Sequence, residues 1–266
     1  MPKQPPHKWG WTKDLGDFRD QPFSSPFRAD ALQFLINLMP LVKQILDQGQ
    51  TNTCTGNSTA LALAMVWAKE TGNWTLLSRL FLYWNAGVIE HDTSDDGRQI
   101  RDVFKGAAKY GVPYEQTWPF NEQDLAKKPT PAVFSDAANR KLVTYSAVAQ
   151  DISQLAGCLQ SGYPFVFGVS VYDSFESDQA ANTGIIPMPL ASESMLGGHA
   201  ICGVGRNDGP APVALPGGFT WPARTVAFAN SWGESWGAKG FGFIPYEYIL
   251  NPQMASDFWT PRLLAK

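Results

Sequence analysis

The stretch from Thr55 to Glu70 constrains the fold most strongly, because it is apolar on nearly every side. A helix that lacks a polar face has to be buried all round. Gly72 follows at the place where a left-handed residue commonly ends a helix. We therefore expect a central helix that the rest of the chain covers.

The hydrophobic pattern changes near residue 125. Before it, Ser78 is placed to cap a second helix, and residues 98–109 carry apolar side chains at three- and four-residue spacing, with Gly111 as a stop signal. After it, short segments rich in β-forming residues alternate with turn residues, which is typical of an antiparallel sheet or barrel. These segments are Phe165–Tyr172, Ala200–Val204, Thr225–Ala229 and Gly240–Ile244.

The two patterns together predict an α+β fold with two halves and a cleft between them. The helical half is expected at residues 31–125 and the β half at residues 126–266. Residues 1–30 are expected to form an extended segment that packs on the β half.

Composition fits a globular protein. Hydrophobic residues make up 44% of the 266 residues and charged residues only 17%, which argues against disorder. The net charge of -3 gives no basic surface for nucleic acid, and no apolar run is long enough for a membrane span. The start of the chain, Met1–His7, lacks the apolar core of a signal peptide. We expect a cytoplasmic monomer, with export by a non-classical route left open.

Cysteine chemistry centres on Cys54. This residue opens the central helix, where unpaired N–H groups and a partial positive charge favour a thiolate. Cys158 and Cys202 fall in a helical segment and an apolar strand, which is typical of buried structural cysteines. There is no CxxC pair, and the calcium-like start at Asp92 lacks the glutamate that ends such a loop. We expect no metal and no cofactor.

Two distant segments complete a pattern with Cys54. One is Gly197-Gly-His199, the other is Asn230-Ser-Trp-Gly, and Gln48 lies six positions before the cysteine. This combination resembles the papain family of cysteine peptidases. The separation of Cys54 and His199 falls within the roughly 130–150 residues of papain-type enzymes. Asn230 lies further along the chain from Cys54 than expected for the family. The Pro- and Gly-rich residues 206–224 are interpreted as a long loop, which would account for the additional separation.

The resemblance implies a role for each of these residues. Cys54 would be the nucleophile, His199 the general base and acid, Asn230 the residue that orients the histidine, and Gln48 a donor to the oxyanion. The opening Trp9–Asp20, together with Ser78–Tyr83, is similar to a bacterial branch of the family.

Thr51 and Thr55 depart from the secreted members of the family, which carry a cysteine and a tryptophan at these places. The corresponding disulfide cannot form. We therefore expect reduced thiols and a reducing compartment.

The family resemblance also predicts the substrate cleft. It implies an apolar second subsite, which favours an apolar residue two positions before the cleaved bond. Independently of the resemblance, residues 174–195 show no clear periodicity, which makes them a candidate flap over the cleft. The implied substrate-binding residues are Asp96, Gly97, Phe167, Val169, Met195, Leu196, Gly198 and Trp232.

The resulting hypothesis is a cysteine endopeptidase that hydrolyses peptides or proteins through a thiolate–imidazolium pair and an acyl-enzyme. A proteinaceous inhibitor is a further partner that the resemblance allows. The alternative is a non-proteolytic protein on the same scaffold, either an acyl-transfer enzyme or a binding protein. Thr51 and Thr55 keep this alternative open.

Overall fold

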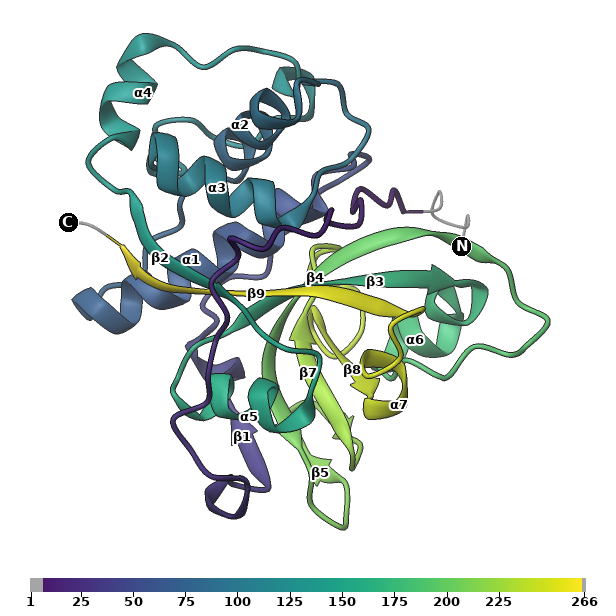
Figure 1. The fold of residues 1–266 in the computed structure, drawn as a ribbon. Helices are drawn as coiled ribbons and strands as arrows, with labels where there is room; N and C mark the ends of the chain where they lie inside the picture. Colours follow the sequence, from purple (N-terminus) through teal and green to yellow (C-terminus); the bar gives the residue numbers. More distant parts are fainter. Residues whose placement is uncertain (1–6, 265–266) are drawn as a thin grey trace.

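The computed structural model describes residues 7–264, and Figure 1 shows a helical half above a twisted sheet. The predicted α+β class is confirmed. Residues 1–6 of the expected N-terminal segment and residues 265–266 of the expected β half lie outside the described residues. Among residues 7–264 no helix is both long and apolar enough to cross a membrane.

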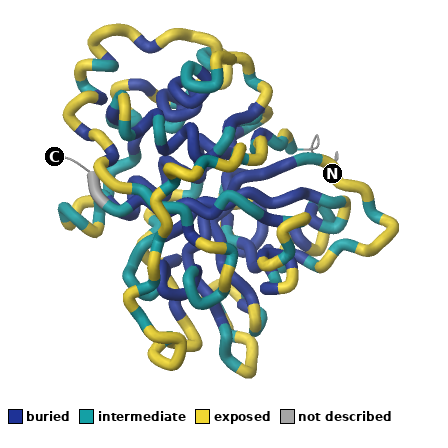
Figure 2. The backbone as a smooth tube through the Cα atoms, viewed as in Figure 1, coloured by how far each residue is buried: buried dark blue, intermediate teal, exposed yellow. Residues whose placement is uncertain are grey.

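The central helix is α1 (Cys54–Thr71), and it is buried without interruption from Cys54 to Val66. It packs against strands β4 (Met195–Asn207) and β9 (Ala255–Leu264), where Figure 2 shows the densest buried region. Gly72 ends the helix in the left-handed conformation, with its N–H bonded to the carbonyl of Ala68. The helix predicted from its all-round apolar character is confirmed.

Three further helices build the helical half: α2 (Arg79–Glu90), α3 (Ile100–Tyr110) and α4 (Pro131–Ala137). Ser78 caps α2, because its hydroxyl accepts a hydrogen bond from the N–H of Phe81 at 3.1 Å. A separate apolar cluster joins α2 to α4, so the helical half extends beyond residue 125. Its buried members are Leu80, Phe81, Trp118, Val133 and Ala137.

The main sheet has seven antiparallel strands in the order β2-β9-β3-β4-β7-β8, and β1 pairs with β4. Strand β1 therefore belongs to the sheet, although its residues fall within 31–125, the range expected for the helical half. A small β5–β6 hairpin lies within the Pro- and Gly-rich residues 206–224. The strands not yet bounded are β1 (Leu35–Asn37), β2 (Leu142–Ala147), β3 (Phe165–Tyr172), β5 (Val213–Ala214), β6 (Thr220–Trp221), β7 (Thr225–Ala229) and β8 (Phe241–Pro245).

Short helices α5 (Ile152–Gln160), α6 (Asp178–Thr183) and α7 (Tyr246–Ile249) surround the sheet. The expected flap at residues 174–195 contains α6 and is fastened to β8, since the N–H of Phe243 donates to the carbonyl of Gly184 at 2.7 Å. Single 3-10 turns occur at Ala29–Ala31, Met39–Leu41, Glu122–Asp124 and Asp173–Glu176.

Residues 7–14, here called the strap, run between the two halves (Figure 1, dark purple). The N–H of Trp11 donates to the carbonyl of Gly198 in the β half at 2.9 Å. On the other side, the N–H of Arg98 donates to the carbonyl of Gly10 at 2.8 Å. The N-terminal segment thus contacts both halves, whereas the sequence had suggested the β half alone.

Candidate active site

The structure brings Cys54, His199 and Asn230 together from three separate elements. Cys54 is the first residue of α1, His199 lies on β4, and Asn230 directly follows β7. Each of the three is buried. The first turn of α1 has no side-chain cap at Thr53, so the helix N-terminus is available to act on the thiol.

Hydrogen bonding fixes the tautomer of His199. Its Nε2 lies 2.8 Å from Oδ1 of Asn230, and the same oxygen accepts the N–H of Ser231 at 2.8 Å. Because Oδ1 is an acceptor in both contacts, Nε2 carries the proton. Nδ1 is left with a free lone pair and has no hydrogen-bond partner among residues 7–264. His199 is therefore prepared to act as a base through Nδ1.

Trp232 covers this pair. Its indole stacks on the imidazole of His199, with ring centroids 4.7 Å apart and an angle of 22° between the planes. The indole is only 4% exposed. It therefore shields the His199–Asn230 hydrogen bond from water.

Gln48 lies in a loop that hydrogen bonds brace. Its side-chain N–H donates to the carbonyl of Thr51 at 2.7 Å, and its Oε1 accepts from the hydroxyl of Ser231 at 2.7 Å. The hydroxyl of Thr51 lies 2.7 Å from both the carbonyl of Gln48 and the hydroxyl of Thr53. Thr51 thus stabilises the loop in the place where a secreted member of the family carries a cysteine.

The strap lies against Gln48 and beside Cys54. The side-chain amide of Gln48 donates to the carbonyl of Lys8 at 3.1 Å, and the backbone groups of Ala200 and Gly10 lower the pKa of the Cys54 thiol, against the larger effect of burial. A Cβ added at Gly10 would lie 1.7 Å from the carbonyl oxygen of Asn52. The backbone of the strap is therefore in close contact with the loop that carries Gln48 and leads into Cys54.

Glu176 fastens the front of the strap. The imidazole of His7 stacks on Trp232 with centroids 4.0 Å apart, and its Nδ1 lies 3.0 Å from a carboxylate oxygen of Glu176. The indole N–H of Trp9 donates to the other oxygen at 3.2 Å. The segment once expected to be a flap thus contributes a residue that holds the strap over Trp232.

Burial sets the protonation of the catalytic pair in this closed state. It raises the pKa of the Cys54 thiol to about 11 and lowers the pKa of His199 to about 4. Both side chains are therefore neutral near pH 7, and the thiolate–imidazolium pair is absent. Removing the strap would return solvent to both groups and would favour the ion pair.

Three of the predicted substrate-binding residues lie at the strap. Gly97 and Gly198 approach it so closely that a Cβ would meet Gly10 and Trp11, and Trp232 stacks on His7. Asp96 is exposed and bonds the hydroxyl of Ser94. Met195 and Leu196 are exposed at the start of β4, at 57% and 38%.

Phe167 and Val169 lie on the other face of β3 from the Trp11 indole. Phe167 stacks on Phe258 in the core with centroids 5.0 Å apart, and Val169 is fully buried. Gly168, between them, faces the indole, since a Cβ on it would lie 2.0 Å from that ring. Because side chains alternate along a strand, Gly168, and not Phe167 or Val169, forms the part of β3 that faces the Trp11 indole.

Sequence reasoning missed several residues at the site. The backbone of Arg98 pairs with the strap on both sides of Trp11, at the position directly after Gly97. The hydroxyl of Ser231 donates to Gln48, and the carbonyl of Lys8 accepts from the side-chain amide of Gln48. Only Arg98 had a signal in the sequence, because it directly follows the expected substrate-binding residues Asp96 and Gly97.

Comparisons with known proteins agree with this geometry. A family model described as papain family cysteine protease matches residues 35–257. An uncharacterized peptidase C1-like protein of Acanthamoeba polyphaga mimivirus is 34% identical over 231 residues, which span 83% of this chain and 70% of that protein. Among solved structures, xylellain, a cysteine protease from Xylella fastidiosa, has a TM-score of 0.86 and 34% identity, with 98% of both chains covered.

A more distant structure, digestive procathepsin L 3 of Tenebrio molitor, shares the fold with a TM-score of 0.67 at 20% identity. The matched region covers 92% of this chain and 74% of the procathepsin chain. The similarity to xylellain confirms the predicted bacterial branch.

Proposed function

Because the chain belongs to the papain family of cysteine proteases, we propose that it is an endopeptidase that the strap keeps inactive in the state described above. One observation carries this proposal. The amide of Gln48 already binds a peptide carbonyl, that of Lys8, while His199 and Asn230 are hydrogen-bonded to each other. The donor and the base are in place, and a segment of the chain itself takes the position of a substrate.

The catalytic steps follow from these residues. Once the strap is displaced, His199 takes the thiol proton through Nδ1, and the Cys54 thiolate attacks the substrate carbonyl. The backbone N–H of Cys54 and the amide of Gln48 stabilise the oxyanion, each by about 3–4 kcal/mol in comparable enzymes. The imidazolium then protonates the leaving amine, and neutral His199 activates a water molecule that releases the acyl group from Cys54.

Covalent labelling tests the nucleophile. The full chain is incubated with an epoxysuccinyl peptide inhibitor and read by intact mass and peptide mapping. We expect slow addition of one inhibitor at Cys54 and none at the buried Cys158 or Cys202. The His199→Ala variant should not be labelled. Equal labelling of this variant, or preferential labelling of another cysteine, would contradict the proposed catalytic pair.

A second assay distinguishes cleavage within a peptide chain from cleavage at its ends. An internally quenched peptide blocked at both ends is offered to the protein after the strap has been weakened by substitution. Cleavage within this peptide is the expected result. Hydrolysis confined to peptides with a free terminus would instead indicate an exopeptidase. Acyl transfer to an added amine, without hydrolysis, would favour the alternative function on the same scaffold.

A further inference from the structure

Arg79, the first residue of α2, connects the helical half to the segment that carries Gln48. Its Nη1 donates to the carbonyl of Asp47, directly before Gln48, at 2.8 Å. The same nitrogen donates to Oδ1 of Asn57, in the first turn of α1, at 2.8 Å. Because Cys54 is the first residue of α1, Arg79 links the backbone beside one proposed oxyanion donor to the helix that supplies the other.

The carbonyl of Asp47 is available for this contact because of the way its segment pairs with the β half. On that side, the N–H of Gln48 donates to the carbonyl of Ser231 at 2.9 Å. Two residues earlier, the carbonyl of Leu46 accepts the N–H of Gly233 at 3.0 Å. Asp47 lies between these two bonds in an antiparallel bridge, so its own carbonyl points the opposite way. The β half thus holds one side of the segment, and the first residue of α2 holds the other.

The amide of Asn57 has a fixed orientation, because a guanidinium can only donate hydrogen bonds. Its Oδ1 faces Arg79, and its Nδ2 donates to the carbonyl of Thr53 at 2.9 Å and to the hydroxyl of the same residue at 3.0 Å. Thr53 directly precedes the nucleophile. The loop between Gln48 and Cys54 is therefore tied at both ends to one guanidinium.

Glu115 aims this guanidinium. Its Oε1 accepts a hydrogen bond from Nε of Arg79 at 3.1 Å, and its Oε2 accepts the backbone N–H of the same residue at 3.1 Å. The guanidinium also lies over the ring of Phe120, with Cζ 4.2 Å from the centroid. The two charged side chains are only 14% and 19% exposed. A lysine would keep the charge but not these directions, because an ammonium lacks the planar fork.

We propose that Arg79 is a positioning residue for the peptidase reaction: it holds the amide of Gln48 at its distance from the backbone N–H of Cys54, and Glu115 keeps it in place. The inference rests on the proposed function and adds a residue that acts without touching the substrate. Because both donors stabilise charge that develops in the transition state, an error in their spacing should lower kcat and leave KM nearly unchanged.

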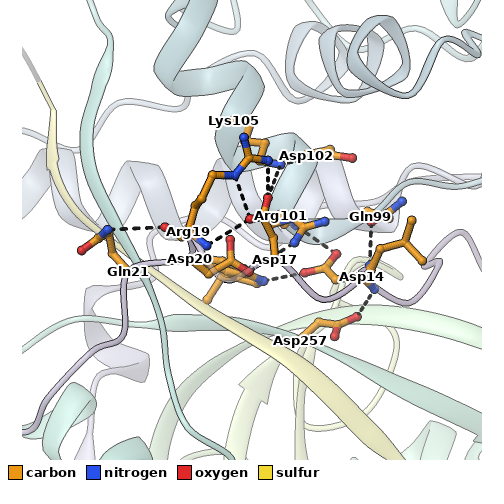
Figure 3. A network of polar contacts seen from close by, with 12 residues as sticks. Asp14, Asp17, Arg19, Asp20, Gln21, Gln99, Arg101, Asp102, Lys105 and Asp257 are labelled. Carbon is orange, nitrogen blue, oxygen red and sulfur yellow. Dashed lines mark hydrogen bonds and ion pairs between the residues drawn. The ribbon is translucent and has the colours of Figure 1, made fainter.

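The test uses the full chain with the strap displaced by Gly10→Ala and Trp11→Ala together, and an internally quenched peptide as substrate. The first substitution adds a methyl group where there is no room, and the second removes the indole that lies against Gly168. The far end of the strap is anchored separately, since the N–H of Asp14 donates to the carboxylate of Asp257 at 2.7 Å, as Figure 3 shows. The two substitutions therefore clear the cleft while that end stays bound.

Arg79→Lys should lower kcat by about 10–100-fold, since a displacement of about 1 Å costs about 100-fold, with KM changed by less than about threefold. Alkylation of Cys54 by iodoacetamide should keep its rate within about threefold, because the thiolate displaces iodide without forming an oxyanion. A general defect of the fold would slow both reactions. Glu115→Gln should lower kcat in the same way but less, since Arg79 keeps its own donors.

A double-mutant cycle determines whether Arg79 acts through Gln48. In the Gln48→Ala background the positioned amide is gone, so Arg79→Lys should change kcat by less than about threefold. Arg140→Lys is the matched control. The Arg140 guanidinium is also largely buried, lies 3.8 Å from the centroid of the Tyr114 ring and donates to the carbonyl of Val112 at 3.1 Å. These contacts stay within the helical half, so this variant should keep kcat within about threefold.

The outcomes separate this inference from the proposed function. An unchanged kcat in Arg79→Lys, or in Glu115→Gln should the first variant not fold, would overturn the role of Arg79 and leave the peptidase intact. An equal loss of kcat with and without Gln48→Ala would overturn it as well, and so would a loss of alkylation as large as the loss of kcat. Absence of both turnover and Cys54 labelling in the strap-displaced parent would overturn the proposed function, and this inference with it.

Discussion

Replacing Gly10 by alanine should open the cleft. The added Cβ would lie 1.7 Å from the carbonyl oxygen and 2.4 Å from the carbonyl carbon of Asn52. Asn52 cannot move aside easily, because its N–H is bonded to the carboxylate of Asp95 at 3.1 Å. The seated strap therefore has to shift away from the nucleophile, whereas the open state accommodates the methyl group freely.

The magnitude follows from the cost of overpacking. Forcing an extra methyl group into a packed site typically costs about 1–3 kcal/mol. At about 1.4 kcal/mol for each factor of ten, the open fraction rises about 5–150-fold. If the closed state predominates in the wild type, the rate of Cys54 labelling at low inhibitor concentration should increase by the same factor, because only the open state reacts.

The assay compares second-order rate constants of labelling by an epoxysuccinyl peptide inhibitor. Gly16→Ala is the matched control, because a Cβ at Gly16 meets nothing within 4 Å. This variant should be labelled at the rate of the wild type. If Gly10→Ala were labelled no faster than Gly16→Ala while both remained folded, the strap would not control access to Cys54.

Three other predictions concern the catalytic residues and the anchoring of the strap. In the protein whose strap is displaced by Gly10→Ala and Trp11→Ala together, Gln48→Ala should lower kcat by about 10²–10³-fold with little change in KM, as for the loss of an oxyanion donor. An unchanged kcat would exclude Gln48 from that role. Asn230→Ala should lower kcat/KM by about 5–150-fold, which corresponds to about 1–3 kcal/mol for a buried hydrogen bond left unmade. It should also shift the pH profile of labelling, since Asn230 fixes the His199 ring; a lower rate with the same profile would point to a purely structural defect. Burial raises the pKa of Asp14 from 3.8 to about 7, so the wild type should lose stability relative to Asp14→Asn as the pH rises through this range. Melting temperatures measured from pH 4 to 8 should therefore diverge with increasing pH, and a constant difference would refute the assignment.

The parts of the fold that sequence predicted well have strong local signals. The central helix was recognisable from its apolar surface, and Gly72 and Ser78 marked helix ends that the structure reproduces. The segments expected at 165–172 and 225–229 are strands β3 and β7 with the same bounds. In each of these cases, the pattern of burial along a short stretch determines the element.

Residues of the cleft were harder to predict, because their positions depend on strand facing and on tertiary contacts. An error of one residue along a strand exchanges its two faces. This is how Phe167 and Val169 were expected in the pocket that Gly168 in fact lines. Strand β9 has a bulge at Asp257, between its pairs with Val166 and Gly168 of β3, and Gly10 lies closely against Asn52. Neither feature has a local signal in the sequence, since both depend on segments distant in the chain.

The hydrogen-bonded brace of the Gln48 loop has a consequence for handling the protein. A disulfide can be opened by a reductant, but the contacts among Gln48, Thr51 and Thr53 have no redox chemistry. A thiol reagent added to keep Cys54 reduced therefore leaves the oxyanion loop in its shape. Activity lost on oxidation and regained on reduction should then report the state of the nucleophile itself.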